Sequence, residues 1–303
     1  MATALRVGFE GQPGAHSETV AVSLFSTQPE FRNRGLETVG HESFEKVFEA
    51  VATSQLDYGV LPLENSVTGT FYKVLDLLHR HSLHIVGETI RHEQHNLVAL
   101  PGVTLDEITE VRSHPFAIEQ CRGFLGTLGK HVAIGQSLDT AASALEIKTH
   151  GLRHTAAIVS MRAAEMYGLA VLQRGVEDDP NNVTRYVLVA REPIAPQRHT
   201  DPRTTVSVAL KNQTGAMFKA LACFSMREIN ICKIESRPSP RSIRLAKPWE
   251  YILYIDVDGS IADPPVANAL RHLQELAVVR VLGSYPRYPQ PSEPSVGLFG
   301  IGM

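Results

Sequence analysis

Apolar positions in the N-terminal part of the chain repeat with two different periods. Two segments place apolar residues at i, i+3, i+4 and i+7, which is the period of a helix with one buried face. These segments are Phe44, Val47, Phe48, Val51 and Phe71, Val74, Leu75, Leu78. The run from Tyr58 to Leu63 between them is continuously apolar, as expected of a strand covered on both faces. The pattern predicts helices packed against a buried sheet.

The same alternation of strands and helices continues to about residue 190. A first strand is expected from Leu5 to Phe9, and a helix is expected to begin near Ser17 after a Gly-Gln-Pro-Gly break. Further strands are expected at His84 to Val86, Asn96 to Leu100, Thr109 to Arg112, Val132 to Ile134, Ala156 to Val159, Ala170 to Leu172 and Val183 to Ala190, with helices near Pro115, Asp139 and Met161. This order favours an α/β fold with mainly parallel sheet, arranged as one sheet or as two lobes with a cleft between them.

A segment without apolar periodicity separates this region from a second one. Residues 192–203 contain three prolines, which predicts a linker with few contacts between the first region, 1–191, and the domain that follows, 204–286. The expected elements beyond it are strands at Thr205 to Leu210, Ile231 to Glu235, Tyr251 to Val257 and Val278 to Gly283, and helices at Ala216 to Arg227 and Val266 to Ala277. A βαββαβ order is that of the ferredoxin-like unit. A long loop is expected at 239–249 and a disordered tail at 287–303.

Composition and charge narrow the class of protein. The 303 residues are 43% hydrophobic and 20% charged, as in globular proteins, with a formal net charge of -3. Lys and Arg are scattered, so nucleic acid and anionic membranes are not expected as partners. We found no secretion signal and no apolar stretch long enough to cross a membrane, which favours the cytoplasm, or a plastid if a transit peptide had been removed.

The three cysteines, Cys121, Cys223 and Cys232, form no CxxC pair, and the histidines form no cluster at metal-ligand spacing. We therefore expect a reducing compartment and no structural metal. Cys121 lies at helical spacing with Ile118 and Leu125, which favours a role in core packing over a reactive thiol.

Four predicted strand-to-helix junctions carry small polar residues where a helix begins. They are Gly11 to Ser17, Glu64 to Thr70, Ser113-His114-Pro115 and Asp139-Thr140. Helix N-termini offer unpaired N–H groups, so junctions that converge at one end of a sheet can bind a small anion. For each junction taken singly, simple N-caps and turns are the favoured interpretation, and only the four together favour a site.

The segment Asp178 to Tyr186 carries a second signal. A polar loop leads into an apolar strand whose first residues include Thr184 and Arg185, on opposite faces of the strand. A guanidinium can hold a carboxylate through two hydrogen bonds, and a hydroxyl can donate or accept one. Arg185 paired with an acidic residue of the loop is the structural alternative.

These segments together resemble the successive motifs of the prephenate and arogenate dehydratases. The resemblance is carried by Val7 to Glu18, Leu61 to Thr70, Ser113-His114-Pro115, Asp139 to Ala142 and Asn181 to Tyr186, and in the second region by Gly215 to Phe218 and Ile234 to Pro238, which are similar to the phenylalanine-site motifs of the ACT domain in that family. It extends from residue 5 to 286 in the order of the family.

The resemblance implies a two-lobed catalytic region like a type II periplasmic binding protein, followed by a regulatory ACT domain. It implies decarboxylating dehydration of prephenate to phenylpyruvate in phenylalanine biosynthesis, with arogenate as the alternative substrate. Formation of an aromatic ring drives this reaction, so it requires no cofactor or metal. A sensor of amino acids without catalytic activity is the alternative from another class.

The resemblance also assigns roles to residues. Thr184 would act at the leaving hydroxyl, with Glu64, if burial raised its pKa, or His114 as other sources of the proton. The expected substrate-binding residues are Asn65, Ser66, Gly69, Thr70, Ser113, Thr140 and Arg185, the last of which binds a carboxylate or braces its loop.

The second domain is expected to bind L-phenylalanine as an effector, at the interface of a homodimer or homotetramer. The expected effector residues are Asn212, Gly215, Ala216, Met217, Phe218, Glu235, Ser236 and Arg237. The chain departs from the family at His16, where Phe or Tyr is usual, and at Phe116, where Gln is usual. The second departure removes a polar contact near the cleft and affects the expected substrate preference.

Overall fold

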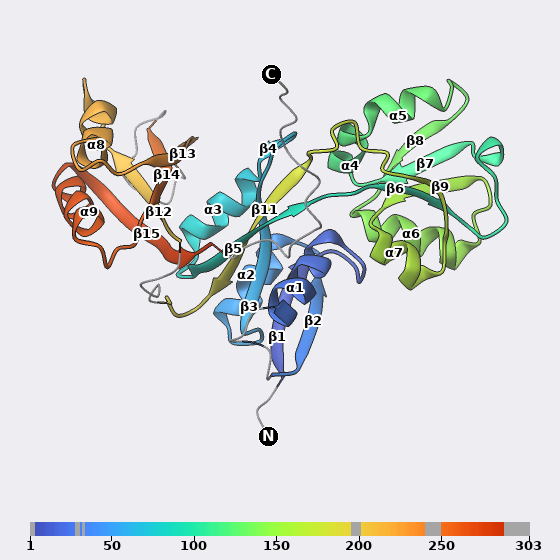
Figure 1. Ribbon diagram of the computed structural model, residues 1–303, viewed down its shortest axis with the longest axis horizontal. Coiled ribbons are helices and arrows are strands. Elements are labelled where there is room, and N and C mark those ends of the chain that lie inside the picture. Colours follow the sequence, from blue (N-terminus) through green and yellow to red (C-terminus); the bar gives the residue numbers. More distant parts are fainter. Residues whose placement is uncertain (1–3, 28–30, 32–33, 195–200, 240–249, 288–303) are drawn as a thin grey trace, which may run out of the picture. The chain divides into compact units, whose positions relative to one another are not determined.

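The computed structural model describes residues 4–27, 31, 34–194, 201–239 and 250–287 (Figure 1). Residues 195–200 of the predicted linker, the predicted loop from 240 onward and the predicted tail after Arg287 lie outside these residues. The chain forms two compact units. Among the described residues, the first unit holds those up to Phe71 and Thr89–Tyr186, and the second holds Tyr72–Glu88 and those from Val187 onward.

The first sheet has the strand order β2-β1-β3-β11-β5, with the short strand β4 beside β3. Its strands are β1 (Leu5–Glu10), β2 (Leu36–His41), β3 (Tyr58–Asn65), β4 (Gly69–Thr70), β5 (His84–His92) and β11 (Val183–Ala190), and its first helices are α1 (His16–Thr27) and α2 (Phe44–Ala52). β1 pairs in parallel with both β2 and β3. The apolar positions that predicted α2 are buried, and Ser43 caps its N-terminus by accepting from the Lys46 N–H.

The second sheet has the order β10-β6-β9-β7-β8. Its strands are β6 (Asn96–Ala99), β7 (Glu110–Ser113), β8 (Ala133–Gln136), β9 (Thr155–Val159) and β10 (Ala170–Arg174), and its helices are α4 (Pro115–Gln120), α5 (Arg122–Thr127), α6 (Thr140–His150) and α7 (Met161–Tyr167). Alternate residues of its central strands pack on opposite sides: Val98 and Ala157 contact α6 and α7, and Leu97 and Ala156 contact α4. Figure 1 shows the two helix layers with the strands between them.

The sequence predicted most of these elements and missed three. β2 was not predicted because its residues are half-exposed or exposed, so it carries no apolar run. β4 and α5 are too short for a periodic pattern. The expectation of mainly parallel strands was wrong for the second sheet, where β6 pairs antiparallel with both β9 and β10. The two separate sheets agree with the two-lobed arrangement.

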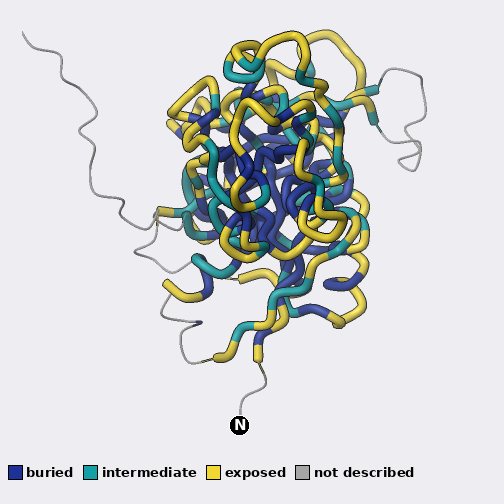
Figure 2. The backbone as a smooth tube through the Cα atoms, turned by 90° about the vertical axis from the view of Figure 1, so that its right-hand side faces the viewer, coloured by how far each residue is buried: buried dark blue, intermediate teal, exposed yellow. Residues whose placement is uncertain are grey.

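Cys121 lies in the interior of the first unit. Its side chain is completely buried among Leu97, Val111 and Ile158, and burial raises the pKa of its thiol above the usual range. The prediction of core packing for this cysteine is confirmed. Figure 2 shows the buried residues on the inside of the fold and the exposed residues on the outer turns.

The C-terminal elements form the predicted βαββαβ unit. They are β12 (Pro202–Leu210), α8 (Ala216–Ser225), β13 (Ile231–Pro238), β14 (Tyr251–Asp258), α9 (Pro264–Leu276) and β15 (Ala277–Pro286), in the sheet order β13-β14-β12-β15. Both helices lie on one face of this sheet, and Phe224 and Leu273 pack on Val206, Ile255 and their neighbours (Figure 1). β12 begins at Pro202, within the predicted linker.

Helix α3 (Tyr72–Arg80) and the part of strand β5 up to Glu88 belong to the same compact unit as this βαββαβ sheet. Arg280 on β15 donates hydrogen bonds to the carbonyl oxygens of His79, at 2.7 Å, and His81, near the end of α3. Arg203 on β12 forms a buried ion pair with Glu88 at 2.8 Å. The expectation of few contacts between the regions was therefore wrong, because linker composition does not reveal what the sheet beyond it touches.

Candidate active site

Asn65 and Thr184 form the centre of a buried hydrogen-bond network in the first unit. The Asn65 amide nitrogen donates to Thr184 Oγ1 at 2.8 Å and to Asn182 Oδ1 at 2.7 Å. Its Oδ1 accepts from the backbone N–H groups of Val67 and Thr68, both at 2.9 Å. Asn65 and Thr184 are 2% and 0% exposed. Two motifs far apart in sequence are thus held together by one amide side chain.

The hydrogen bond from Asn65 makes the Thr184 hydroxyl oxygen an acceptor. Because Oγ1 accepts from the amide, the Thr184 proton is left to be donated elsewhere. Alternation along β11 puts Thr184 on the same face as Tyr186, about 7 Å further along the strand. Thr184 thus shares a strand face with Tyr186, which lines the cavity described below, although Thr184 is not itself among the lining residues.

Ser66 adds two further links between the same motifs. Its hydroxyl oxygen accepts from the Val183 N–H at 3.1 Å, and its own N–H donates to the Val183 carbonyl at 2.9 Å. The turn closes through β4, in which Gly69 pairs with Asn65 and Thr70 pairs with Glu64. Gly69 has a φ of +83°, a conformation that glycine adopts without steric cost.

Glu64 and Arg185 form an ion pair on the other face of these strands. Arg185 Nη1 lies 3.7 Å from Glu64 Oε2, and the Arg185 side chain is 8% exposed. Neighbouring residues of a strand point to opposite faces. The ion pair with Glu64 therefore places the Arg185 side chain on the face of β11 opposite Thr184, as the sequence predicted. The contact favours the bracing role for Arg185 and leaves Glu64 with a cationic partner.

A cavity in the first unit is built from three of the four predicted junctions. Its lining residues are Glu10, Ala15, His16, Ser17, Phe44, Pro62, Phe71, Glu93, His95, His114, Phe116, Ala117, Gln120, Asp139, Thr140 and Tyr186. Its volume is about 140 Å³, close to the ~150 Å³ of an apolar cavity that holds a benzene ring. The polar residues of the fourth junction form the Asn65 network instead.

The cavity has one aromatic wall. Phe71 packs against Phe44 and Phe116, with ring centroids 6.5 Å and 5.2 Å apart. Phe116 therefore extends an apolar surface where the family has an amide. Such a wall can lie against a six-membered ring and lowers the local polarity.

His114 and Thr140 are the two predicted site residues that line this cavity. His114 Nδ1 accepts from the Phe116 N–H at 3.3 Å, so the proton of a neutral ring is on Nε2. Burial lowers the pKa of His114, against the opposing effect of Asp139 and Glu93. At neutral pH the ring is a neutral hydrogen-bond donor. Ser113 lies apart, since its buried hydroxyl donates to the Ile158 carbonyl at 2.7 Å.

The sequence did not single out Glu93, His95, Gln120 or Tyr186, which also line the cavity. The Tyr186 hydroxyl donates to Glu93 Oε1 at 2.6 Å, and burial raises the pKa of that phenol well above its usual value. The available signal was a polar run from Arg91 to Gln94 between two apolar strands. A polar run is also typical of an exposed turn, so the signal was not specific.

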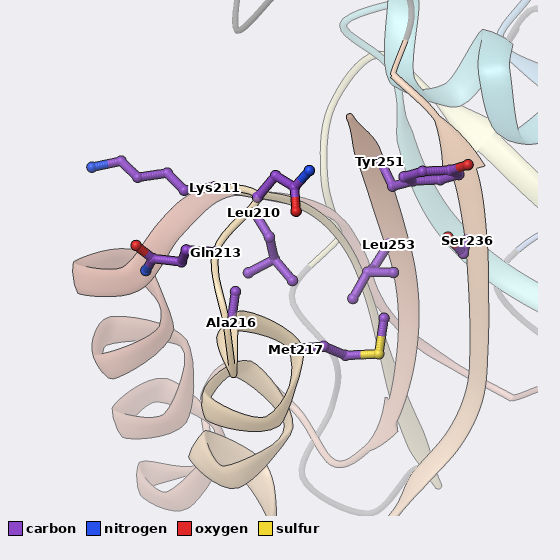
Figure 3. Close-up of a pocket in the computed structure, with 9 residues that line it drawn as sticks. Leu210, Lys211, Gln213, Ala216, Met217, Ser236, Tyr251 and Leu253 are labelled. Atoms are coloured by element: carbon purple, nitrogen blue, oxygen red, sulfur yellow. The ribbon is translucent and has the colours of Figure 1, made fainter. Parts of the chain in front are cut away.

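A second cavity, of about 380 Å³, lies in the C-terminal sheet at the start of α8 (Figure 3). It is lined by Leu210, Lys211, Asn212, Gln213, Ala216, Met217, Ser236, Tyr251 and Leu253. Met217 reaches from α8 toward Leu253 on β14, whereas the Lys211 side chain points away. Four predicted effector residues, Asn212, Ala216, Met217 and Ser236, therefore contribute to one cavity.

The other predicted effector residues lie around it. Gly215 caps α8 with a φ of +74°, and Phe218 is 77% exposed. Alternation along β13 places Glu235 and Arg237 on the face opposite Ser236. Arg237 there forms an ion pair with Asp76 at 3.0 Å. These two charged side chains do not reach the cavity.

Among the described residues no helix is long and apolar enough to cross a membrane, and no group of His, Cys, Asp and Glu is arranged to hold a metal ion. The three cysteines are free thiols.

Comparison with known proteins matches the chain to one family model and to several relatives and solved structures. A family model described as prephenate dehydratase matches residues 7–194. Arogenate dehydratase 1 of Petunia hybrida is 44% identical over 301 residues, which cover 96% of this chain and 69% of that protein. The chloroplastic arogenate dehydratase/prephenate dehydratase 6 of Arabidopsis thaliana is 42% identical, with 96% and 71% covered. The solved prephenate dehydratase of Arthrobacter aurescens in complex with L-Phe is 30% identical, with a TM-score of 0.82 over 96% of this chain and 94% of that one.

Proposed function

The chain belongs to the prephenate dehydratase family, and on this premise we propose that it removes water and carbon dioxide from prephenate or from its aminated form, arogenate. The products are phenylpyruvate and phenylalanine, respectively. The observation that carries the proposal is the Asn65–Thr184 hydrogen bond, which leaves a buried hydroxyl with its proton to donate. The proposed site comprises this hydroxyl and the adjacent cavity.

Thr184 acts in this proposal on the hydroxyl group that leaves C4 of the ring. A threonine is a weak acid, so its contribution is a hydrogen bond that strengthens as negative charge develops on the leaving oxygen. The neutral His114 is a second donor in the cavity. The aromatic wall of Phe44, Phe71 and Phe116 orients the ring and favours loss of the ring carboxylate by lowering the local polarity.

The experiment that tests this function is turnover by the purified full-length chain. We expect the absorbance of phenylpyruvate to appear from prephenate, or phenylalanine to appear from arogenate, without any added cofactor. Tight binding of phenylalanine without turnover of either substrate would instead support the sensor without catalytic activity.

The cavity at α8 is the site that we propose for L-phenylalanine, the molecule present in the Arthrobacter aurescens structure. Leu210, Met217 and Leu253 provide apolar surface for a side chain, and the Asn212–Gly215 turn provides backbone N–H groups for a carboxylate. Met217, Phe218 and Tyr251 are 50%, 77% and 44% exposed beside it. Apolar exposure of this kind supports a second copy of the chain as the cover, and thus a homodimer or homotetramer.

Arg237 supplies a route from this cavity to the catalytic region. It follows Ser236 on β13, pairs with Asp76 and lies 4.5 Å from the ring centre of Tyr72. Tyr72 begins α3 directly after Phe71, which lines the first cavity. A ligand that shifts β13 can therefore alter the position of Phe71, provided that it binds the two arrangements with different affinity.

Gly215→Val is expected to abolish both phenylalanine binding and inhibition, measured by calorimetry and by steady-state assays. An added Cβ would meet no atom within 4 Å, so the effect comes from forcing a β-branched residue to a φ of +74°.

Gly215→Asn is the matched control, since asparagine tolerates this conformation and should retain inhibition. Full inhibition of Gly215→Val would place the effector elsewhere in the protein.

The free cysteines support a reducing compartment, either the cytoplasm or a plastid like that of the chloroplastic relative.

A further inference from the structure

The charges that line the first cavity are unusual for a site that must accept an anion. Three carboxylates, those of Glu10, Glu93 and Asp139, are among its lining residues, and no lysine or arginine is. The carboxylates of Asp139 and Glu93 differ in the groups that they bind. Asp139 is occupied by the backbone N–H groups of Gln12, at 2.9 Å, and Ala142, at 2.7 Å, so it serves as a helix cap.

Glu93 has a different set of neighbours. Its side chain receives the Tyr186 hydroxyl at Oε1, and its charge acts on His16 and His114 as well. It follows β5 and is half-buried, and its backbone N–H donates to the Asn182 carbonyl at 3.0 Å, next to the Thr184 network. Glu93 is therefore anchored beside the proposed reaction site and not used as a cap.

The imidazoles next to Glu93 have buried ring nitrogens without partners, and that of His95 presents a lone pair. His95 is 1% exposed, and its Nε2 lies 2.5 Å from Gln120 Oε1, which makes Nε2 the donor and Nδ1 the acceptor. His95 Nδ1 and His16 Nε2 are buried and have no hydrogen-bond partner among the described residues. Burial lowers the pKa of His16 to about 4, so this ring is neutral at pH 7.

A carboxylate beside the unused acceptor of His95 fits a ligand group that carries positive charge and several N–H bonds. We propose that Glu93 determines substrate preference, by binding the ammonium group of arogenate and disfavouring the keto acid prephenate. A keto oxygen offers only lone pairs to the Glu93 carboxylate and leaves the buried His95 acceptor unpaired. The inference rests on the proposed dehydratase function and names the substrate form.

The test is kcat/KM for both substrates in the full-length protein and in Glu93→Gln. We expect the wild-type chain to prefer arogenate by at least about tenfold. Glutamine has nearly the same shape and can still accept from Tyr186, but it lacks the charge. Its kcat/KM for arogenate should fall by about 10- to 100-fold while that for prephenate stays level or rises.

Two further variants separate charge from structure. Glu93→Asp keeps the carboxylate and should keep the preference for arogenate. Tyr186→Phe removes the hydroxyl that positions Glu93 and should raise KM for arogenate severalfold more than KM for prephenate.

A preference that is identical in the wild type and Glu93→Gln, or an equal loss for both substrates in a folded variant, would overturn the role of Glu93 and leave the dehydratase function standing. Absence of turnover of both substrates by the wild type would overturn the function itself.

Discussion

We expect Thr184→Val to lower kcat by about a hundredfold or more and to leave the fold intact. Valine has the shape of threonine without the hydroxyl, so the hydrogen bond to the leaving group is lost. The fold should survive because the Asn65 amide keeps its 2.7 Å hydrogen bond to Asn182. The measurements are steady-state kinetics on the better substrate and a thermal melt of the same sample.

Thr184→Ser is the control, since it restores the hydroxyl without the methyl group and should recover most of the activity. A Thr184→Val variant with nearly normal kcat would transfer the donor role to His114. His114→Phe tests this alternative. If it is inactive while Thr184→Val is active, the imidazole is the donor.

Asn65→Leu has the second large effect, on both stability and turnover. It leaves the N–H groups of Val67 and Thr68 without their acceptor, and Asn182 Oδ1 and Thr184 Oγ1 without their donor. Unsatisfied buried polar groups cost ~1–3 kcal/mol each, so we expect the free energy of unfolding to fall by about 3–5 kcal/mol. In the fraction that is folded, kcat should fall at least about tenfold, because Thr184 is no longer oriented.

Urea unfolding and kcat at low temperature are the two measurements. Ser66→Ala is the matched comparison in the same turn, since it removes one side-chain hydrogen bond, to the Val183 N–H, and should cost about 1 kcal/mol. If Asn65→Leu were no more destabilising than Ser66→Ala, the network would not be the element that joins the two motifs.

Local periodicity determined the elements of this protein. Phe44, Val47, Phe48 and Val51 are buried in α2 because a spacing of three and four residues puts them on one face of any helix. The βαββαβ order of the C-terminal region was likewise readable, since the apolar residues that its strands place in the core are buried in β12 and β14 and partly buried in β13 and β15. Strand β2 was not, because it is held by backbone pairing to β1 and its side chains are only partly buried.

The sequence motifs also identified residues that the fold brings together, but the hydrogen-bond partners of these residues differ. Asn65 and Thr184 meet although they are 119 positions apart. Ser113 was also predicted from a strand-to-helix junction, yet its hydroxyl donates to the Ile158 carbonyl of the neighbouring strand. Whether a polar residue at a strand end faces a cavity or its own sheet depends on the adjacent strand, which its sequence neighbours do not encode.

The cavity itself was decided by tertiary structure alone. Glu93 and Tyr186 come from strand regions 93 positions apart, and each by itself is an ordinary residue of a turn or a strand. Their 2.6 Å contact, and the buried ring nitrogens of His16 and His95 beside it, exist only because two sheets and the chain between them close around one space. Spacing along the chain determines which residues share a face of one helix or strand. Long-range packing determines which helices and strands line the same cavity.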